Sequence, residues 1–149
     1  MGERLHTILF VSGVVAGLAW LTVSGSASQG KPAADKSEIE RGRYLVEEVA
    51  KCTECHTPRE ANGDLKQDAW LQGAPIWIVP VKPIRNWADQ APPLAGVPSF
   101  TEEQGERVLE KGTGPQGGAL RPPMHIYHMK HEDAKAIMEY LKSLPRAGR

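Results

Sequence analysis

Apolar residues recur at helical spacing in three stretches of this 149-residue chain. The first stretch is residues 37–50, where Ser37 followed by Glu40 is typical of a helix start. Gly42 lies on the apolar face of this predicted helix. A glycine inside a helix costs about 1 kcal/mol relative to alanine, which favours close packing against a neighbour. The other members of the face are Ile39, Leu45, Val46 and Val49.

Two further helices are predicted in the second half of the chain. Residues 101–111 begin with a threonine cap and have Gln104 three positions later, and Gly112 can end the helix. Residues 131–144 form the last helix, which Pro145 stops because proline cannot continue a helix. The apolar stripe of the last helix consists of Ala134, Ile137, Met138, Leu141 and Leu144.

The long segment 57–100 has neither helical nor strand periodicity. Residues 74–81 are the one short run that reads as an extended segment. Prolines at this density exclude long helices, so we expect a loop. The prolines of the segment are Pro58, Pro75, Pro80, Pro83, Pro92, Pro93 and Pro98.

The N-terminal end is different in character from the remainder of the chain. Residues 8–23 form an uncharged apolar run that follows Arg4 and precedes small residues, with Ala27 as a candidate cleavage edge. The pattern predicts a signal peptide or an uncleaved N-terminal membrane anchor over residues 1–28, a linker over 29–36 and one domain over 37–149. A basic residue before the run keeps the N-terminus inside, so the domain is expected outside the cytoplasmic membrane.

The balance of charges argues against nucleic-acid binding, and the composition indicates a loop-rich domain. The chain has 18 basic and 18 acidic residues, so it lacks the basic excess of nucleic-acid-binding proteins, and we expect no nucleic acid partner. Aromatic residues are few, and glycine and proline are frequent. A loop-rich domain of this kind gains stability from a large apolar centre such as a bound cofactor.

The strongest chemical motif is Cys52-Thr53-Glu54-Cys55-His56, which has the Cys-x-x-Cys-His pattern of c-type haem attachment. Two thiols can add to the two vinyl groups of one porphyrin, and the following histidine can bind the iron. The chain has only two cysteines, and both lie in this motif. That number is what a single haem requires.

A Cys-x-x-Cys pair has two other common uses, a redox dithiol and a zinc site. A thioredoxin-like redox pair lies near a βαβ pattern, whereas here a predicted helix precedes the motif. A structural zinc site needs four ligands and usually a second cysteine pair, which this chain lacks.

A methionine later in the chain is a candidate for the second iron ligand. Met124 follows Arg121-Pro122-Pro123, and two prolines fix the backbone just before the thioether. A methionine in a loop is ordinarily a core residue, but a haem elsewhere in the chain favours a ligand. Other donors crowd the same region, namely His125, His128, Met129 and His131.

The long loop could also contact a haem. Its polar and aromatic side chains are candidates for hydrogen bonds to the haem propionates, although they could equally fill the loop's own core or face water. These candidates are Arg59, Trp77, Arg85 and Trp87.

The order of these features resembles that of class I single-haem cytochromes c over residues 37–145. The matching segments are Gly42-Arg43-Tyr44-Leu45, the Cys-x-x-Cys-His motif, Pro92-Pro93-Leu94-Ala95-Gly96, Arg121-Pro122-Pro123-Met124 and residues 136–145. The resemblance implies an all-α cytochrome c fold, with three main helices and long loops around one covalently attached haem c. It implies that Gly42 and Tyr140 meet where the first and last helices cross. It also implies axial ligation of the iron by His56 and Met124. The last helix departs from the family pattern, because Lys130 and His131 stand where a serine or threonine cap is usual.

The expected function is one-electron transfer, without substrate chemistry, between membrane or periplasmic redox proteins. The resemblance implies a dehydrogenase, a respiratory complex or an oxidase as partner, and a place in the periplasm or on the outer face of the cytoplasmic membrane. Two other classes remain open from the sequence. One is a haem enzyme or gas sensor with an open sixth position on the iron, and the other is a structural cytochrome subunit of a larger membrane complex.

Overall fold

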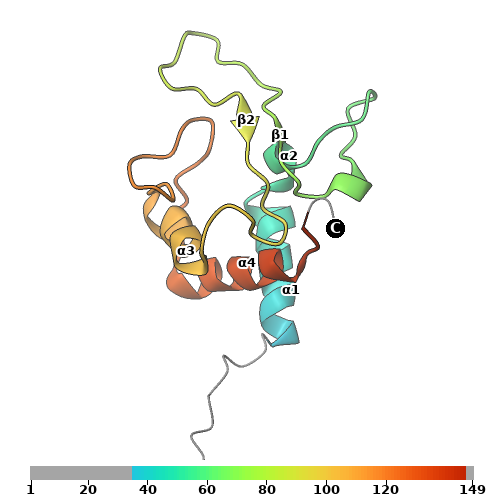
Figure 1. The fold of residues 1–149 in the computed structure, drawn as a ribbon, viewed down its shortest axis with the longest axis vertical. Coiled ribbons are helices and arrows are strands. Elements are labelled where there is room, and N and C mark those ends of the chain that lie inside the picture. The colour runs from blue at the N-terminus through green and yellow to red at the C-terminus, as the bar shows by residue number, and fades with distance from the viewer. Residues whose placement is uncertain (1–34, 147–149) are drawn as a thin grey trace, which may run out of the picture. The chain divides into compact units, whose positions relative to one another are not determined.

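The computed structural model describes residues 35–146, and helices joined by long loops make up this part of the chain (Figure 1). The predicted leader and most of the predicted linker lie outside the described residues. The three main helices confirm the all-α prediction. The helices are α1 (Lys36–Tyr44), α2 (Thr53–His56), α3 (Glu102–Lys111) and α4 (His131–Ser143), with a π-helical turn over Leu45–Val49 and a 3₁₀ turn over Gln67–Ala69; the strands are β1 (Ala74–Pro75) and β2 (Gln90–Ala91).

The first helical stretch covers the predicted range but begins and ends differently. Asp35, and not Ser37, is the N-cap: its carboxylate accepts the backbone N–H of Ser37 at 3.2 Å. The Ser37 hydroxyl also donates to Asp35, so the predicted cap is itself a partner of the true cap. After α1 the helix widens into the π turn, which closes with the bond from Ala50 N–H to the Leu45 carbonyl.

Helices α1 and α4 cross one another (Figure 1), and Gly42 lies at the crossing. A Cβ atom at Gly42 would lie 2.0 Å from the Ala136 carbonyl oxygen and 2.8 Å from Cβ of Tyr140. The predicted meeting of Gly42 and Tyr140 is therefore confirmed. Polar bonds flank the crossing, from the Tyr140 hydroxyl to Glu47 and from the Lys135 ammonium to Glu38, each 2.6 Å long.

The third main helix, α3, begins and ends as its sequence predicts. Thr101 and Gln104 form a reciprocal capping box, and Gly112 ends the helix with a φ of 66°. Gly105 lies against the side chain of Met138, so α3 packs closely on α4. The buried core gathers residues from the main helices and from the loops: Leu45, Val46, Cys52, Leu71, Ala95, Val97, Leu109, Ala134, Ala136, Ile137, Met138, Tyr140 and Leu141.

The extended segment expected over residues 74–81 is much shorter than predicted. The strand covers Ala74 and Pro75, which pair antiparallel with Ala91 and Gln90, and one further bond joins the Ile76 N–H to the Asp89 carbonyl. Proline lacks the N–H group that a strand pairing needs, and the prolines that follow prevent the ladder from continuing. The connection from β1 to β2 instead forms a loop that extends away from the helices (Figure 1). No helix within residues 35–146 has both the length and the apolar character required to cross a bilayer.

Candidate haem site

The Cys-x-x-Cys-His motif lies on α2 and on the residue before it. Lys51 adopts a left-handed φ of 52°, which turns the chain sharply between the π turn and α2. The bond from His56 N–H to the Cys52 carbonyl, 2.9 Å long, closes one helical turn. Cys52 and Cys55 are both free thiols, the first buried and the second partly exposed. A single turn thus presents two thiols and an imidazole from adjacent positions.

The imidazole of His56 has one nitrogen committed to the protein and one left for a ligand. Its Nδ1 lies 2.8 Å from the carbonyl oxygen of Pro92. A carbonyl only accepts, so Nδ1 carries the hydrogen and Nε2 keeps its lone pair. Burial lowers the pKa of His56, which keeps the ring neutral. A neutral imidazole whose second nitrogen bonds a carbonyl is the usual arrangement of a metal-binding histidine.

The Met124 loop, defined here as residues 121–130, is anchored at its beginning to the β1–β2 loop. Arg121 donates through Nη2 to the Trp87 carbonyl at 2.8 Å and through Nε to the Asn86 carbonyl at 3.2 Å. The Ala88 N–H donates to the carbonyl of Pro122 at 2.7 Å. Met124 itself is partly buried. These long-range bonds fix the backbone immediately before the methionine.

The histidines near Met124 have other surroundings. His125 and His128 are exposed, and the ring of His125 contacts the ring of Tyr127. The Nδ1 atom of His131 lies 2.9 Å from a carboxylate oxygen of Glu110, and this contact raises the pKa of the histidine. His131 therefore already has a carboxylate partner, Glu110, at the start of α4.

The four propionate candidates have different hydrogen-bonding states. The indole N–H of Trp77 donates to the Glu54 carbonyl at 3.1 Å, and the Arg59 guanidinium lies over the Trp77 ring while bonding Glu54 and Gly63. Arg85 is exposed. Among the described residues, the indole nitrogen of Trp87 and Nε of Arg59 are buried without a hydrogen-bond partner. Buried donors without an acceptor are uncommon in proteins, so these two donors are available to a bound group or to water.

The residues of the motif and of the nearby loops suit a haem. His56 offers a lone pair to the iron, the two cysteines stand one helical turn apart, and Trp87 offers an unused buried donor to a carboxylate. The donor set therefore fits a c-type haem. Trp87 was one of four propionate candidates from the sequence, and the structure separates it from Trp77, whose indole N–H already has a partner. The Pro92 carbonyl could not be identified from the sequence, because it lies 36 positions from His56.

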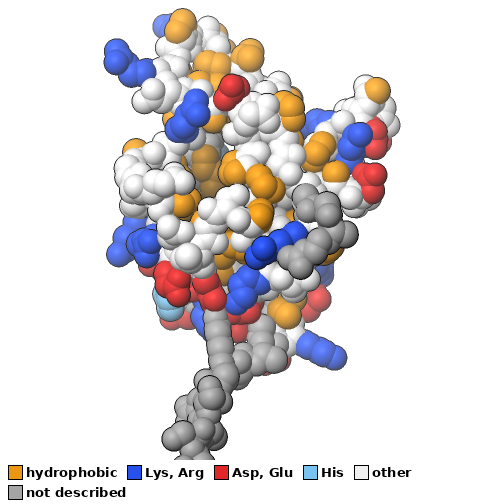
Figure 2. Space-filling model, in the orientation of Figure 1, with side chains coloured by type: hydrophobic (Ala, Val, Ile, Leu, Met, Phe, Trp, Pro, Cys, Tyr) orange, Lys and Arg blue, Asp and Glu red, His pale blue; other side chains and the backbone are white. Residues whose placement is uncertain are grey.

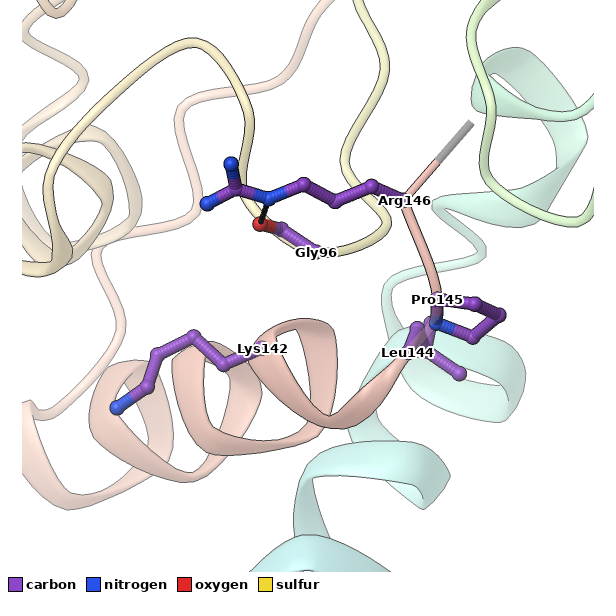
Figure 3. A pocket seen from close by; sticks show the side chains of 5 residues that line it. All are labelled: Gly96, Lys142, Leu144, Pro145 and Arg146. Atoms are coloured by element: carbon purple, nitrogen blue, oxygen red, sulfur yellow. Dashed lines mark hydrogen bonds between the residues drawn. The ribbon is translucent and has the colours of Figure 1, made fainter. Parts of the chain in front are cut away.

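Two hollows lie outside the motif itself. One is lined by Lys142, Leu144, Pro145, Arg146 and Gly96, and Figure 3 shows Arg146 reaching across it to bond the Gly96 carbonyl. The other lies beside the motif and is lined by residues that follow His56 and by β1: Thr57, Pro58, Arg59, Ala74, Pro75 and Trp77.

The β1–β2 loop carries hydrophobic side chains on its surface. Trp77 is 60% exposed, Val79 is 85% exposed and Val81 is fully exposed. Figure 2 shows hydrophobic side chains on this loop and again near the middle of the same face.

The comparisons with known proteins agree with the geometry. The family model for cytochrome c matches residues 39–145, so the chain belongs to the cytochrome c family. Members of this family bind haem c covalently and transport electrons, and the two cysteines of this chain suit one such haem.

Relatives of known function include cytochrome subunits of dehydrogenases. The chain is 33% identical over 112 residues to the fructose dehydrogenase cytochrome subunit of Gluconobacter japonicus, covering 70% of this chain and 22% of that protein. It is 34% identical over 116 residues to a diheme cytochrome c-type protein of Cereibacter sphaeroides, covering 72% and 36% respectively. It is 32% identical over 132 residues to the cytochrome c subunit of the quinone alcohol dehydrogenase of Gluconobacter oxydans, covering 76% and 26%. The matched part of the chain therefore spans between 22% and 36% of the length of these three relatives.

Proposed function

We propose that the protein is a one-electron carrier whose haem is attached through Cys52 and Cys55 and bound axially by His56 and Met124. The observation that carries the proposal is the 2.8 Å contact between His56 Nδ1 and the Pro92 carbonyl, which leaves Nε2 for the iron. A bound haem would supply an iron that alternates between the ferrous and ferric states. The protein chain would attach the haem, orient the histidine ligand and supply the second ligand.

The residues that would hold the haem differ in what each contributes. The two thiols hold the cofactor covalently, and the Pro92 carbonyl fixes the plane and tautomer of the His56 ring. Met124 contributes a thioether, which favours the ferrous state and raises the reduction potential. Trp87 supplies a buried donor for a propionate. With both axial positions filled, no site remains for a substrate, so the protein would act as a carrier and not as an enzyme.

We further propose that the electron donor is a dehydrogenase, and that the domain works on the outer face of the cytoplasmic membrane. The names of two relatives support the first point, because they are cytochrome subunits of dehydrogenases. The apolar run after Arg4 supports the second.

Attachment can be tested by extraction of the exported protein in acidic acetone. We expect the haem to remain on the polypeptide of the parent. Because each cysteine would form one thioether bond to the porphyrin, Cys52→Ser and Cys55→Ser should each retain the haem through the remaining bond, and only the double variant should release it. Free extraction of haem from the parent would contradict the attachment.

The carrier function can be tested by mixing the reduced protein with carbon monoxide. Because both axial positions are filled, binding should be slow and should require displacement of Met124. Rapid binding would instead indicate a haem enzyme or a gas sensor.

The choice of donor can be tested in membranes of cells that produce the protein. Addition of a sugar or alcohol substrate of a resident dehydrogenase should reduce this haem. Membranes that contain the double cysteine variant should lack that spectral component. A haem that no dehydrogenase substrate reduces, while other cytochromes of the membrane are reduced, would argue against a dehydrogenase donor.

A further inference from the structure

One hydrogen bond joins the far end of the Met124 loop to the segment that carries the cysteines. The phenol of Tyr127 donates to the carbonyl of Ala50 at 2.9 Å, across 77 positions of sequence. Tyr127 is partly buried, and burial raises its pKa to about 12. The phenol therefore remains a hydrogen-bond donor at neutral pH.

The acceptor of this bond is a carbonyl at the end of a helix. Ala50 is the residue that closes the π turn, and carbonyl groups at helix ends lack partners in the helix. The chain turns sharply at Lys51 and reaches Cys52 immediately afterwards. Tyr127 therefore satisfies a backbone group only two residues before the first attachment cysteine.

The Met124 loop is thus held on both sides of the methionine. On one side Arg121 and Pro122 are bonded to residues 86–88, and on the other Tyr127 is bonded to Ala50. Tyr127 lies three residues after Met124, so the loop cannot swing away from the attachment segment while this bond is intact.

We infer that Tyr127 is a positioning residue that keeps Met124 at the iron by holding the loop against the attachment segment. This inference rests on the proposed ligation by His56 and Met124. Its consequence is kinetic: the bond from Tyr127 to Ala50 must break before the loop opens and the methionine leaves. Tyr127 touches no reacting atom in this account, and it acts through Met124.

The test is the rate at which imidazole replaces the native ligand of the ferric, haem-loaded, full-length protein. At saturating imidazole this rate equals the rate of methionine loss. Tyr127→Phe keeps the ring that contacts His125 but removes the donor. Loss of one partly buried hydrogen bond corresponds to up to about a tenfold change, so we expect replacement to be up to about tenfold faster. Tyr44→Phe is the matched control, because Tyr44 is 55% exposed on α1, and its rate should equal that of the parent.

A second control separates positioning from general loss of stability. Val46 is fully buried in the core and belongs to the π turn, so Val46→Ala destabilises the fold without removing the phenol. We expect Val46→Ala to change imidazole replacement much less than Tyr127→Phe does when the two are compared at equal loss of stability in denaturant. Equal acceleration by both variants would show that Tyr127 is only structural.

The proposed ligation and the positioning role can fail separately. If Met124→Ala keeps the far-red absorption band of a sulfur–iron bond, the ligation by Met124 is wrong. If Met124→Ala loses the band but Tyr127→Phe exchanges its ligand at the parental rate, the ligation stands and the positioning role is wrong.

Discussion

Replacing Gly42 by alanine would place a methyl group inside the crossing of α1 and α4. The new Cβ atom would lie 2.0 Å from the Ala136 oxygen and 2.6 Å from the Ala136 carbonyl carbon. Both atoms belong to the backbone of α4, so no side-chain rotation can relieve the overlap. Helices α1 and α4 would have to move apart by more than an ångström, or the local helix would have to distort.

The expected cost follows from two opposing effects. Overpacking of a well-packed core costs about 1–3 kcal/mol, and an overlap with rigid backbone belongs at the upper end of that range. Alanine is about 1 kcal/mol better than glycine within a helix. We therefore expect Gly42→Ala to lower the free energy of unfolding by about 2 kcal/mol.

Gly105→Ala offers a matched control on α3. Its Cβ would lie 2.3 Å from the sulfur and 2.7 Å from the terminal methyl carbon of Met138, which form the far end of a flexible side chain. Both glycines lie inside helices, so the gain in helix propensity is the same and cancels in the comparison. Because Met138 can rotate, this variant should lose clearly less stability than Gly42→Ala.

The assay is denaturant unfolding of the haem-loaded full-length protein, followed by the helical circular dichroism signal. The midpoint should fall for Gly42→Ala and change much less for Gly105→Ala. If Gly42→Ala is as stable as the parent, or is less affected than Gly105→Ala, the close crossing of α1 and α4 is wrong.

Three further predictions concern α3, its contact with α4 and the Met124 loop. Thr101→Ala removes the capping box and should cost about 1 kcal/mol in denaturant unfolding, and an unchanged midpoint would contradict the cap. The bond to Glu110 raises the pKa of His131, so the ion pair contributes stability below about pH 6.5, and the contribution is lost as pH rises through the raised pKa. A histidine titration by NMR should show this raised pKa in the parent and a lower one in Glu110→Gln, and equal values would refute the pairing. Arg121→Ala removes two bonds to the β1–β2 loop and should speed amide hydrogen exchange at Ala88, whereas unchanged exchange would show that the anchor is unimportant.

The main helices could be predicted from the sequence because their signals are local. Periodicity located all three, and the capping box and Gly112 marked both ends of α3. The first cap was misassigned because Asp35 and Ser37 are both good cap residues two positions apart. The sequence pattern cannot decide between them, whereas in the structure the Asp35 carboxylate accepts from Ser37.

The proline-rich loop could not be predicted in the same way. Its shape depends on bonds between distant segments, such as the one between Ala88 and Pro122, and these leave no periodic signal. The attachment motif was visible because its chemistry fixes both residue types and spacing. The Pro92 carbonyl and the Tyr127 phenol were not visible, because their partners lie 36 and 77 positions away.

The absorption spectrum of the ferric protein in the far red reports directly whether a sulfur atom is bound to the haem iron. We expect the weak sulfur–iron band in the parent and in His125→Ala. We expect Met124→Ala to lose the band, to have a lower reduction potential and to bind carbon monoxide faster after reduction. Absence of the band from the parent, or its persistence in Met124→Ala, would contradict ligation by Met124. If His125→Ala loses the native ligation and Met124→Ala keeps it, the second ligand of the iron is His125 and not Met124.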